Sequence, residues 1–526
     1  MAGSPIDQIV ESLKNRNHFV LSGGAGSGKT YTLMQVLDEV FLNDHKATVA
    51  CITYTNVATE EIKARSPYKN LYVSTIHEFL WNCIQPYQKN LKACILELVQ
   101  NEKTIKGSGI RFDGENLDLA TKTVQYKEYK KLEEGVFSHS DLLKIANLMF
   151  RRFPLICDIL KDRYSFIFID EFQDSEKQVL EIFLNFLLAN NSKTNVMGLF
   201  GDPMQSIYST GVGNVDEYIN SNVLKEIKKP DNFRCSKNVI ELLNKIRSDL
   251  QQSPTGKNDQ GQIRFIYSDR DMKISEIKSH EVFKDWDFND FEETKELFLT
   301  HKLIAKEKGY IDLLNAWGSS DRLVGDNKDR LAKHIEKIQK CIYFYEAKKF
   351  MEFTSLVDFK IKKLQDKKEL KEKIESLKTA QEQSIDDNIN LADELNLIFK
   401  DDSLKDFLVE NVDLYQRVKG LSFVQVKNLF DYELGFSPYS TQHGVKGAEF
   451  DNVLVVLDNG GWNMYNFKYF FEDTAGKESI IERTRKIFYV CCSRAKRNLV
   501  VYYHNPSLAV LDKANSLFGQ SNVVKI

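Results

Sequence analysis

Proline is scarce in this chain. Nine prolines occur among 526 residues, which argues against long disordered linkers between folded parts. Long apolar runs are also missing, because none approaches the roughly 20 residues that a membrane-spanning helix needs. The first residues, MAGSPIDQIVESLKNRN, lack the apolar core of a signal peptide. We therefore expect a soluble, cytoplasmic protein without a membrane partner.

The eight cysteines are scattered and form no Cys-x-x-Cys pair, so the sequence indicates neither a disulfide framework nor a zinc site. Cys491 and Cys492 are adjacent, and adjacent cysteines cannot easily present both thiolates to one tetrahedral zinc ion. We expect both to be small buried groups. An excess of one charge is also lacking, since 72 basic and 75 acidic residues leave a net charge of -3. A nucleic-acid partner must therefore be inferred from motifs.

Short apolar runs alternate with helical patterns along much of the chain. Four runs begin near residues 18, 47, 164 and 195, and four more near 262, 296, 452 and 498. Runs that are apolar throughout are typical of parallel strands covered by helices on both faces. The sequence therefore predicts an α/β protein with two similar parallel-sheet lobes. A charged stretch from about 330 to 430 contains no proline and predicts a helical insertion.

The strongest chemical signal is GGAGSGKT, which lies between the apolar run HFVLS and the helical pattern YTLMQVLDEVF. Glycines allow backbone amides to turn toward phosphate oxygens, Lys29 can reach the β and γ phosphates, and the Thr30 hydroxyl can bind Mg²⁺. The whole loop is predicted to bind ATP phosphates. Its residues are Gly23, Gly24, Ala25, Gly26, Ser27, Gly28, Lys29 and Thr30.

A second signal, FIFIDEFQDS, places two carboxylates directly after an apolar run. Asp170 can hold Mg²⁺, and Glu171 can take a proton from the water that attacks the γ phosphate. Acidic residues after a strand are often only a solvated loop. In a chain that also carries a phosphate-binding loop, the catalytic interpretation is favoured.

Eight motifs then occur in an order that resembles the superfamily 1 helicases of the UvrD, Rep and PcrA group. In chain order they are GGAGSGKT, ITYTNVATEEI, VSTIHEF, DEFQDS, GDPMQSIY, DNFRCS, TQHGVKGAEF and YVCCSRAK. The resemblance covers nearly the whole chain and implies two RecA-like lobes with helical insertions. The first lobe is expected at residues 1–84 and 141–229, the second at 230–329 and 431–526, and the insertions at 85–140 and 330–430.

The resemblance also implies roles for single residues. Gln8 is expected to read the adenine edge, Glu449 to contact the ribose, and Gln205 to act as a sensor between the γ phosphate and DNA. Arg234 and Arg494 resemble two arginines that the second lobe supplies to the γ phosphate. The expected catalytic set is Lys29, Glu171, Gln205, Arg234 and Arg494.

Two aromatic residues depart from the usual adenine site of the group. Relatives often carry an arginine over the adenine where this chain has Tyr31, and Phe233 is expected on the other side. An aromatic sandwich around the base is therefore a hypothesis of its own.

The second and third motifs of the group line a groove for single-stranded DNA. Isolated tyrosines are more often core residues, but inside these motifs Tyr54 and Tyr208 are expected to stack on bases. The stacking contacts do not read the sugar, so an RNA substrate stays open as an alternative. The expected DNA contacts are Tyr54, Thr55, Asn56, Thr75, His77, Tyr208, Thr441 and His443.

Two functions follow from the resemblance. The first is an ATP-driven helicase or translocase on single-stranded or tailed DNA, with 3′ to 5′ movement, as in DNA repair. However, the chain continues SIYSTGVGN where relatives carry a Gly-Trp-Arg-Gly run, which leaves strand separation less secure than translocation. The alternative is a nucleotide-gated DNA sensor or docking subunit that controls a nuclease or other effector, as the helicase subunits of Gabija anti-phage systems do.

Overall fold

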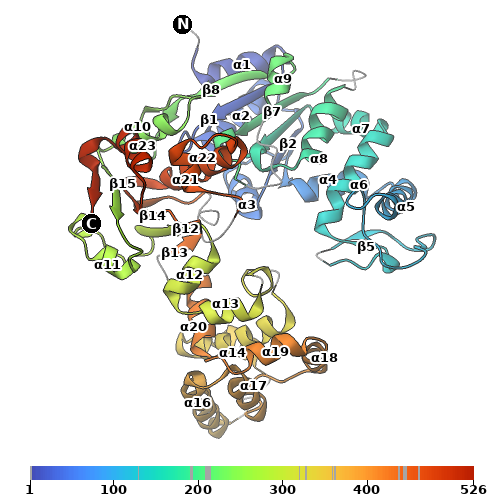
Figure 1. Ribbon diagram of the computed structural model, residues 1–526. Helices are drawn as coiled ribbons and strands as arrows, with labels where there is room; N and C mark the ends of the chain where they lie inside the picture. The colour runs from blue at the N-terminus through green and yellow to red at the C-terminus, as the bar shows by residue number, and fades with distance from the viewer. Residues whose placement is uncertain are drawn as a thin grey trace. The chain divides into compact units, whose positions relative to one another are not determined.

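The computed structural model describes residues 3–127, 129–189, 194–207, 215–318, 320–325, 328–357, 359, 363–435, 439–441, 447–459 and 463–526 (Figure 1). The chain forms two compact units. Unit 1 comprises Met1–Gly261 and Arg485–Ser493, and unit 2 comprises Gln262–Thr484 and Arg494–Ile526. A short segment near the carboxyl end of the chain therefore packs with the amino-terminal unit.

Unit 1 is built on a six-stranded parallel sheet with the strand order β3-β2-β6-β7-β1-β8. The four runs predicted in this part of the chain are β1, β2, β6 and β7, and every residue of these strands is buried. Burial on both faces explains why these runs are apolar throughout. The strands are β1 (Phe19–Gly23), β2 (Val49–Thr53), β3 (Leu71–Thr75), β6 (Phe166–Asp170), β7 (Val196–Gly201) and β8 (Lys225–Lys229).

Side chains of this sheet alternate between two cores. Phe19 and Leu21 of β1 pack into one cluster, whereas Val20 packs into the other, as the two-residue period of a strand requires. Helices cover both faces, so the sheet is the middle layer of unit 1. The helices of the long amino-terminal segment of unit 1 are α1 (Pro5–Lys14), α2 (Lys29–Asn43), α3 (Asn56–Arg65), α4 (Ile76–Ile84), α5 (Gln88–Thr104), α6 (His139–Arg152), α7 (Leu155–Arg163), α8 (Lys177–Leu180), α9 (Asp216–Asn220) and α10 (Lys237–Ile246).

Residues 85–140 contain the helix α5, a 3-10 turn and a small parallel pair of strands, β4 (Gln125–Tyr126) and β5 (Val136–Phe137). A second small pair, β9 (Asp231–Asn232) and β10 (Ser253–Pro254), lies near the end of the first long segment of unit 1. These short pairs extend neither large sheet.

Unit 2 holds a second six-stranded parallel sheet, with the order β13-β12-β14-β15-β11-β16. The four predicted runs of this part are β11, β12, β14 and β15. The prediction of two α/β lobes with parallel sheets is therefore confirmed. The strands are β11 (Gln262–Ser268), β12 (Thr294–Phe298), β13 (Tyr439–Thr441), β14 (Phe450–Val456), β15 (Ala495–His504) and β16 (Val523–Lys525).

Between β12 and β13 the described residues form helices joined by turns and irregular segments, and Figure 1 shows these helices in yellow and orange. Ile335, Ile338 and Ile342 of α14 lie in one core with residues of α16, α17 and α20. The helices are α12 (His301–Lys308), α13 (Ile311–Trp317), α14 (Arg330–Glu346), α15 (Phe350–Leu356), α16 (Leu364–Thr379), α17 (Ile385–Glu394), α18 (Asp402–Glu410), α19 (Val412–Val418) and α20 (Val424–Glu433).

Four further helices accompany the second sheet: α11 (Ile274–Lys278), α21 (Phe467–Glu472), α22 (Glu478–Cys492) and α23 (Leu508–Phe518). The division between the units falls inside α22, whose residues from Arg485 onward belong to unit 1. Cys491 and Cys492 lie at its end and are fully buried, as predicted. Among the described residues, no helix combines the length and the apolar character that a bilayer crossing requires.

Candidate active site

The loop between β1 and α2 is shaped by its glycines. Gly26 and Gly28 have φ angles of 72° and 73°, in the left-handed region that favours glycine. Gly24 is needed for another reason, because a Cβ there would lie 2.4 Å from the side chain of Gln252. The loop therefore wraps closely around the start of α2, where unpaired backbone amides favour an anion.

Lys29 and Ser27 supply polar groups inside this loop. Lys29 is 8% exposed, and its ammonium donates to the carbonyl oxygens of Gly23 (3.2 Å) and Gly24 (3.5 Å). The Ser27 hydroxyl is buried and has no hydrogen-bond partner. A buried cation beside an unsatisfied hydroxyl and a helix N-terminus fits a phosphate group.

Asp170 is the last residue of β6 and Glu171 follows it; β6 is the strand two places from β1 in the sheet. Asp170 is buried and accepts a hydrogen bond from the Thr30 hydroxyl. Burial, and then the neighbouring Glu171 charge, raise the pKa of Asp170 above its ordinary value, while Lys29 opposes the rise. A carboxylate paired with a hydroxyl at this position fits Mg²⁺, which prefers oxygen ligands.

Glu171 adopts a left-handed backbone conformation, with φ 51°. Such a conformation costs a non-glycine residue roughly 1–2 kcal/mol, and residues of this kind cluster at functional sites. The Glu171 carboxylate accepts a hydrogen bond from the Gln173 side-chain amide. The turn thus places one acidic group, Asp170, toward Thr30 and fixes the other through Gln173.

The same contacts continue to Gln205. The side-chain carbonyl of Gln173 accepts from the backbone amide of Asp202 (3.0 Å), and the Asp202 carboxylate accepts from the side-chain amide of Gln205 (2.9 Å). Asp202 is fully buried and Gln205 is 5% exposed. Glu171 and Gln205 are therefore joined by an unbroken series of hydrogen-bonded residues within unit 1.

The segment DNFRCS packs against the phosphate-binding loop. The Phe233 amide donates to the Gly26 carbonyl (2.9 Å), and the Asn232 side chain donates to the Ala25 carbonyl (3.1 Å). A Cβ on Gly26 would lie 2.6 Å from the Cβ of Arg234. The structure therefore places Arg234 beside the loop, in unit 1.

Two exposed aromatic side chains flank Gly28. A Cβ built on this glycine would lie 3.8 Å from the Phe233 ring and 3.9 Å from the Cβ of Tyr31. The exposed fractions are 53% for Phe233 and 65% for Tyr31. Large aromatic surfaces left in water beside a phosphate-binding loop fit the expected base sandwich.

The Gln8 side chain lies in α1, whose residue Ile9 shares a core with Leu33 and Val36 of α2. In the structure its amide donates to the Gly3 carbonyl (2.8 Å). This contact is exposed, so the amide can exchange it for another partner.

Arg494 and Glu449 lie together in unit 2. Arg494 is 1% exposed. Its guanidinium donates to the Ala448 carbonyl (3.2 Å), and its backbone carbonyl accepts from the amide of Phe450 (2.9 Å). Glu449 is the residue between these two contacts. Both residues are expected from the sequence to contact ATP, and the structure brings them to neighbouring positions.

The expected DNA contacts of unit 1 follow two adjacent parallel strands. Thr53 of β2 pairs with Thr75 of β3, so the turns after both strands meet at one edge of the sheet. Thr55 caps α3, and Thr75 caps α4, each by accepting from a backbone amide. Tyr54 is 43% exposed and Asn56 opens α3. These residues form a common surface.

His77 stacks on His139, with ring centroids 3.5 Å apart. Burial, and then His139, lower the pKa of His77 to about 4, so at neutral pH this ring offers a face or a neutral hydrogen bond and not a charge. Thr441 ends β13 in unit 2. Tyr208 and His443 lie outside the described residues, as does the SIYSTGVGN departure after Ile207.

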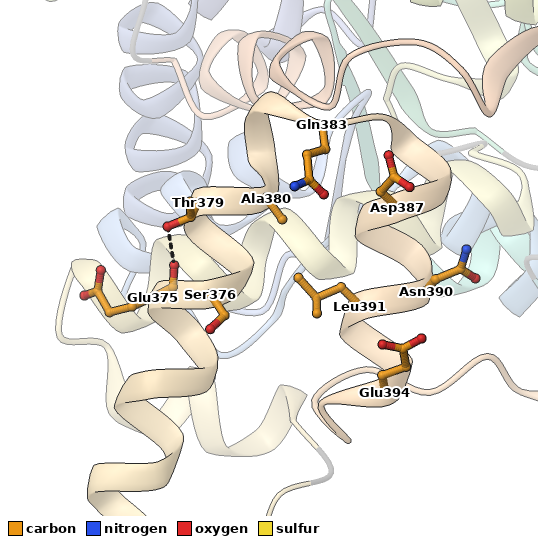
Figure 2. A pocket seen from close by; sticks show the side chains of 9 residues that line it. All are labelled: Glu375, Ser376, Thr379, Ala380, Gln383, Asp387, Asn390, Leu391 and Glu394. Atoms are coloured by element: carbon orange, nitrogen blue, oxygen red, sulfur yellow. Dashed lines mark hydrogen bonds between the residues drawn. The ribbon is translucent and has the colours of Figure 1, made fainter.

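A hollow in unit 2 is lined by acidic side chains and therefore differs in charge from this site. Figure 2 shows it between α16 and α17, with the carboxylates of Glu375, Asp387 and Glu394 around Leu391. Like charges repel, so three acidic groups disfavour a triphosphate or a DNA backbone there. No residue expected at the nucleotide or the DNA lines this hollow.

Sequence reasoning missed several residues that hold the site together. Gln173 and Asp202 lie inside quoted motifs, so their positions were visible although their contacts were not. Tyr489 lies in YVCCSRAK, and its hydroxyl accepts from the amide of Ala25 (3.1 Å). Arg247, which contacts Tyr489 (2.8 Å), belongs to no motif, and no sequence pattern indicated a role for it.

Comparison with known proteins gives the family. An AAA domain matches residues 7–211, and the UvrD-like helicase C-terminal domain matches residues 161–506. The chain belongs to the UvrD-like helicases. It is thus an ATP-hydrolysing enzyme of a DNA helicase family, and the loop between β1 and α2 lies within the residues that match the AAA domain.

This UvrD-like helicase is similar to proteins of different size and setting. It is 26% identical to the Gabija protein GajB of Bacillus cereus (strain HuB5-5), over 98% of this chain and 97% of that protein. It is 22% identical to the ATP-dependent DNA helicase PcrA of Staphylococcus epidermidis, over 92% of this chain and 80% of that protein. The RecBCD enzyme subunit RecB of Buchnera aphidicola is 32% identical over 23% of this chain and 10% of that subunit.

Proposed function

We propose that this helicase is a motor on single-stranded DNA that moves 3′ to 5′ and couples ATP hydrolysis to closure of its two lobes. The observation that carries the proposal is the hydrogen-bonded series from Glu171 through Gln173 and Asp202 to Gln205. It gives the groups around the γ phosphate a direct connection to the expected DNA sensor. The direction of movement rests on the resemblance to the UvrD, Rep and PcrA group.

In this mechanism the residues of unit 1 bind the phosphates and prepare the water. Lys29 and the loop amides neutralise phosphate charge, and Glu171 accepts the proton of the attacking water. Thr30 and Asp170 are the residues that would hold Mg²⁺, which when bound neutralises charge developing on the phosphoryl oxygens. The rigid turn at Glu171 fixes its carboxylate before the reaction starts.

Arginines complete the phosphate site in this proposal. Arg234 and Arg494 both approach the γ phosphate, where planar guanidinium groups stabilise the transition-state charge. Because Arg494 belongs to unit 2, its attraction to a bound γ phosphate stabilises the closed arrangement of the lobes. Hydrolysis removes this attraction, and the lobes separate.

The nucleoside part of ATP is bound by a different set of side chains from the phosphates. Tyr31 and Phe233 sandwich the adenine, Gln8 binds its edge, and Glu449 binds the ribose. The positions of Tyr31 and Phe233 around Gly28 support this part of the proposal.

DNA is gripped at the edge of the first sheet in this proposal. Tyr54 stacks on a base, and Thr55, Asn56, Thr75 and His77 contact the strand. Exposure of Tyr54 and the neutral His77 ring support stacking and hydrogen bonding there. Tyr208, Thr441 and His443 are proposed to extend the contact.

The decisive experiment measures steady-state ATP hydrolysis without nucleic acid and with single-stranded DNA, duplex DNA or RNA. We expect strong stimulation by single-stranded DNA and loss of hydrolysis in Lys29→Ala, because the ammonium no longer neutralises the phosphates. Displacement of streptavidin from the 5′ end but not the 3′ end of biotinylated DNA would then establish the direction. Hydrolysis that ignores every nucleic acid would contradict a motor.

The Tyr31→Ala variant tests the base sandwich. Stacking on an aromatic side chain contributes about 1–3 kcal/mol per base, so the KM for ATP is expected to rise at least about fivefold with little change in kcat. Tyr129→Ala is the matched control, because Tyr129 is 51% exposed and lies outside the motifs. An unchanged KM in Tyr31→Ala would remove this residue from the adenine site.

A second function is supported by one comparison. The match to a Gabija protein extends over nearly all of both chains, so we also propose that this helicase controls a nuclease in anti-phage defence. Its nucleotide state would then gate docking to that partner. Co-purification of a nuclease with the tagged chain in the presence of ATP, and its loss in Lys29→Ala, is the expected result.

A further inference from the structure

The peptide group of Ala25, in the middle of the ATP-binding loop, is held from both sides. Its carbonyl accepts from the side chains of Asn232 (3.1 Å) and Gln252 (3.0 Å). Its amide donates to the hydroxyl of Tyr489 (3.1 Å). Ala25 is 1% exposed, so water cannot replace these partners and the peptide plane is fixed.

The Tyr489 hydroxyl is itself saturated with partners. It accepts from the Arg247 guanidinium (2.8 Å) and lies within donating distance of the Asp202 carboxylate (3.3 Å) and the Gln252 carbonyl (3.4 Å). Tyr489 is fully buried. Burial, and then the Asp202 charge, raise the pKa of this phenol, so the hydroxyl keeps its proton and donates while it accepts.

Arg247 is anchored as firmly. It forms a buried ion pair with Asp202 (3.2 Å) and a second ion pair with the half-exposed Asp249 (2.7 Å), and its guanidinium lies 5.1 Å from the centre of the Tyr489 ring. A charge buried to this extent requires such pairing. Arg247 therefore cannot move without disturbing both Tyr489 and Asp202.

Asp202 connects this cluster to the sensor. Its carboxylate accepts from the Gln205 side chain (2.9 Å) and from the amide of Met204 (3.1 Å). One buried carboxylate thus binds Gln205, Arg247 and Tyr489. A shift of the ATP-binding loop at Ala25 must reach Gln205 through two side chains.

We propose that Tyr489 is a positioning residue that holds the ATP-binding loop in its binding conformation and links it, with Arg247 and Asp202, to Gln205. The part that concerns Gln205 rests on the proposed function. Tyr489 touches neither phosphate nor water in this role. It acts through the backbone of Ala25 and through Asp202.

The test compares Tyr489→Phe with Tyr502→Phe. Both variants keep the ring and lose a buried hydroxyl, but the Tyr502 hydroxyl contacts Ser268 (2.8 Å) in unit 2. Without the Tyr489 hydroxyl the Ala25 amide is left buried and unpaired, and a loss of this kind corresponds to about a tenfold change in binding. We expect the KM for ATP, measured without DNA, to rise about tenfold in Tyr489→Phe only.

Amide hydrogen exchange of the peptide that contains Ala25 gives a second readout that needs no enzymatic activity. We expect faster exchange in Tyr489→Phe and unchanged exchange in Tyr502→Phe, at similar melting temperatures. Normal exchange together with a KM within twofold of the parent enzyme would overturn the proposal. Neither the KM for ATP nor amide exchange is measured with DNA. A failure of DNA to stimulate hydrolysis would therefore contradict the proposed motor and leave both of these tests valid.

A double-mutant cycle tests the link to Gln205. If Tyr489 acts through Asp202 on Gln205, the losses of kcat/KM for ATP in Tyr489→Phe and Gln205→Ala are expected to be non-additive. The double variant should then resemble the more damaged single variant. Strictly multiplicative losses would overturn the link.

Discussion

The Glu171→Gln variant is expected to hydrolyse ATP about a thousandfold more slowly than the parent enzyme while it still binds ATP. Glutamine keeps the shape of the side chain and its contact with Gln173, but it cannot accept a proton, and a positioned general base contributes about 10²–10⁴-fold. The change also removes a negative charge beside Asp170 and the phosphates. ATP affinity should therefore be equal or higher, as equilibrium binding of a fluorescent ATP analogue would measure.

Glu176→Gln is the matched control for this variant. Glu176 lies five residues further along the same turn and precedes α8, but it takes no part in the proposed chemistry. Its kcat, measured without DNA, should stay within about twofold of the parent value, because the half-buried Glu176 is not among the residues proposed to bind or hydrolyse ATP. Retention of more than a tenth of the activity by Glu171→Gln would assign the base to another group.

The Arg494→Lys variant is expected to lower kcat by about 10³-fold or more, with a much smaller effect on the KM for ATP. Arginines of this kind stabilise the transferring phosphoryl group and contribute 10³–10⁵-fold. Lysine keeps the charge but loses the planar fork of donors. Steady-state kinetics at saturating ATP and single-stranded DNA measure the loss.

Stability must be followed in the same experiment, because Arg494 is one of the largest fully buried side chains among the described residues. Arg497→Lys is the control, since Arg497 is exposed and three residues away. A melting temperature close to that of the parent, together with the lost kcat, would separate catalysis from folding. Full activity in Arg494→Lys would show that only charge matters at this position.

The sequence predicted the strands that are buried on both faces, because these are apolar throughout. It did not predict β3, in which only Val73 and Ser74 are buried, β8, which reads KEIKK and buries only Ile227 fully, or the short β13 and β16. Edge strands pair on one side only, so a few buried residues are enough for them and leave no pattern. The ATP-binding loop and the carboxylates after β6 were visible because glycines and acidic residues stand next to apolar strands.

The contacts that stiffen the site could not be predicted in the same way. Ala25 and Tyr489 are 464 positions apart, and no local pattern reports a contact over such a distance. Arg247 looks like any charged residue at the end of a helix. Only the fold reveals that it is buried between Asp202 and Asp249.

The dependence of the ATP-binding loop on Tyr489 has a consequence for synthesis of the chain. The ribosome must add 464 residues after Ala25 before its hydroxyl partner exists, which takes roughly 25–90 s at about 5–20 residues per second. A nascent or prematurely terminated chain therefore carries the loop without its final support. With the roles proposed for Tyr489 and Arg494, the chain becomes a working ATPase only when nearly all of it has been made, and incomplete products are expected not to hydrolyse ATP.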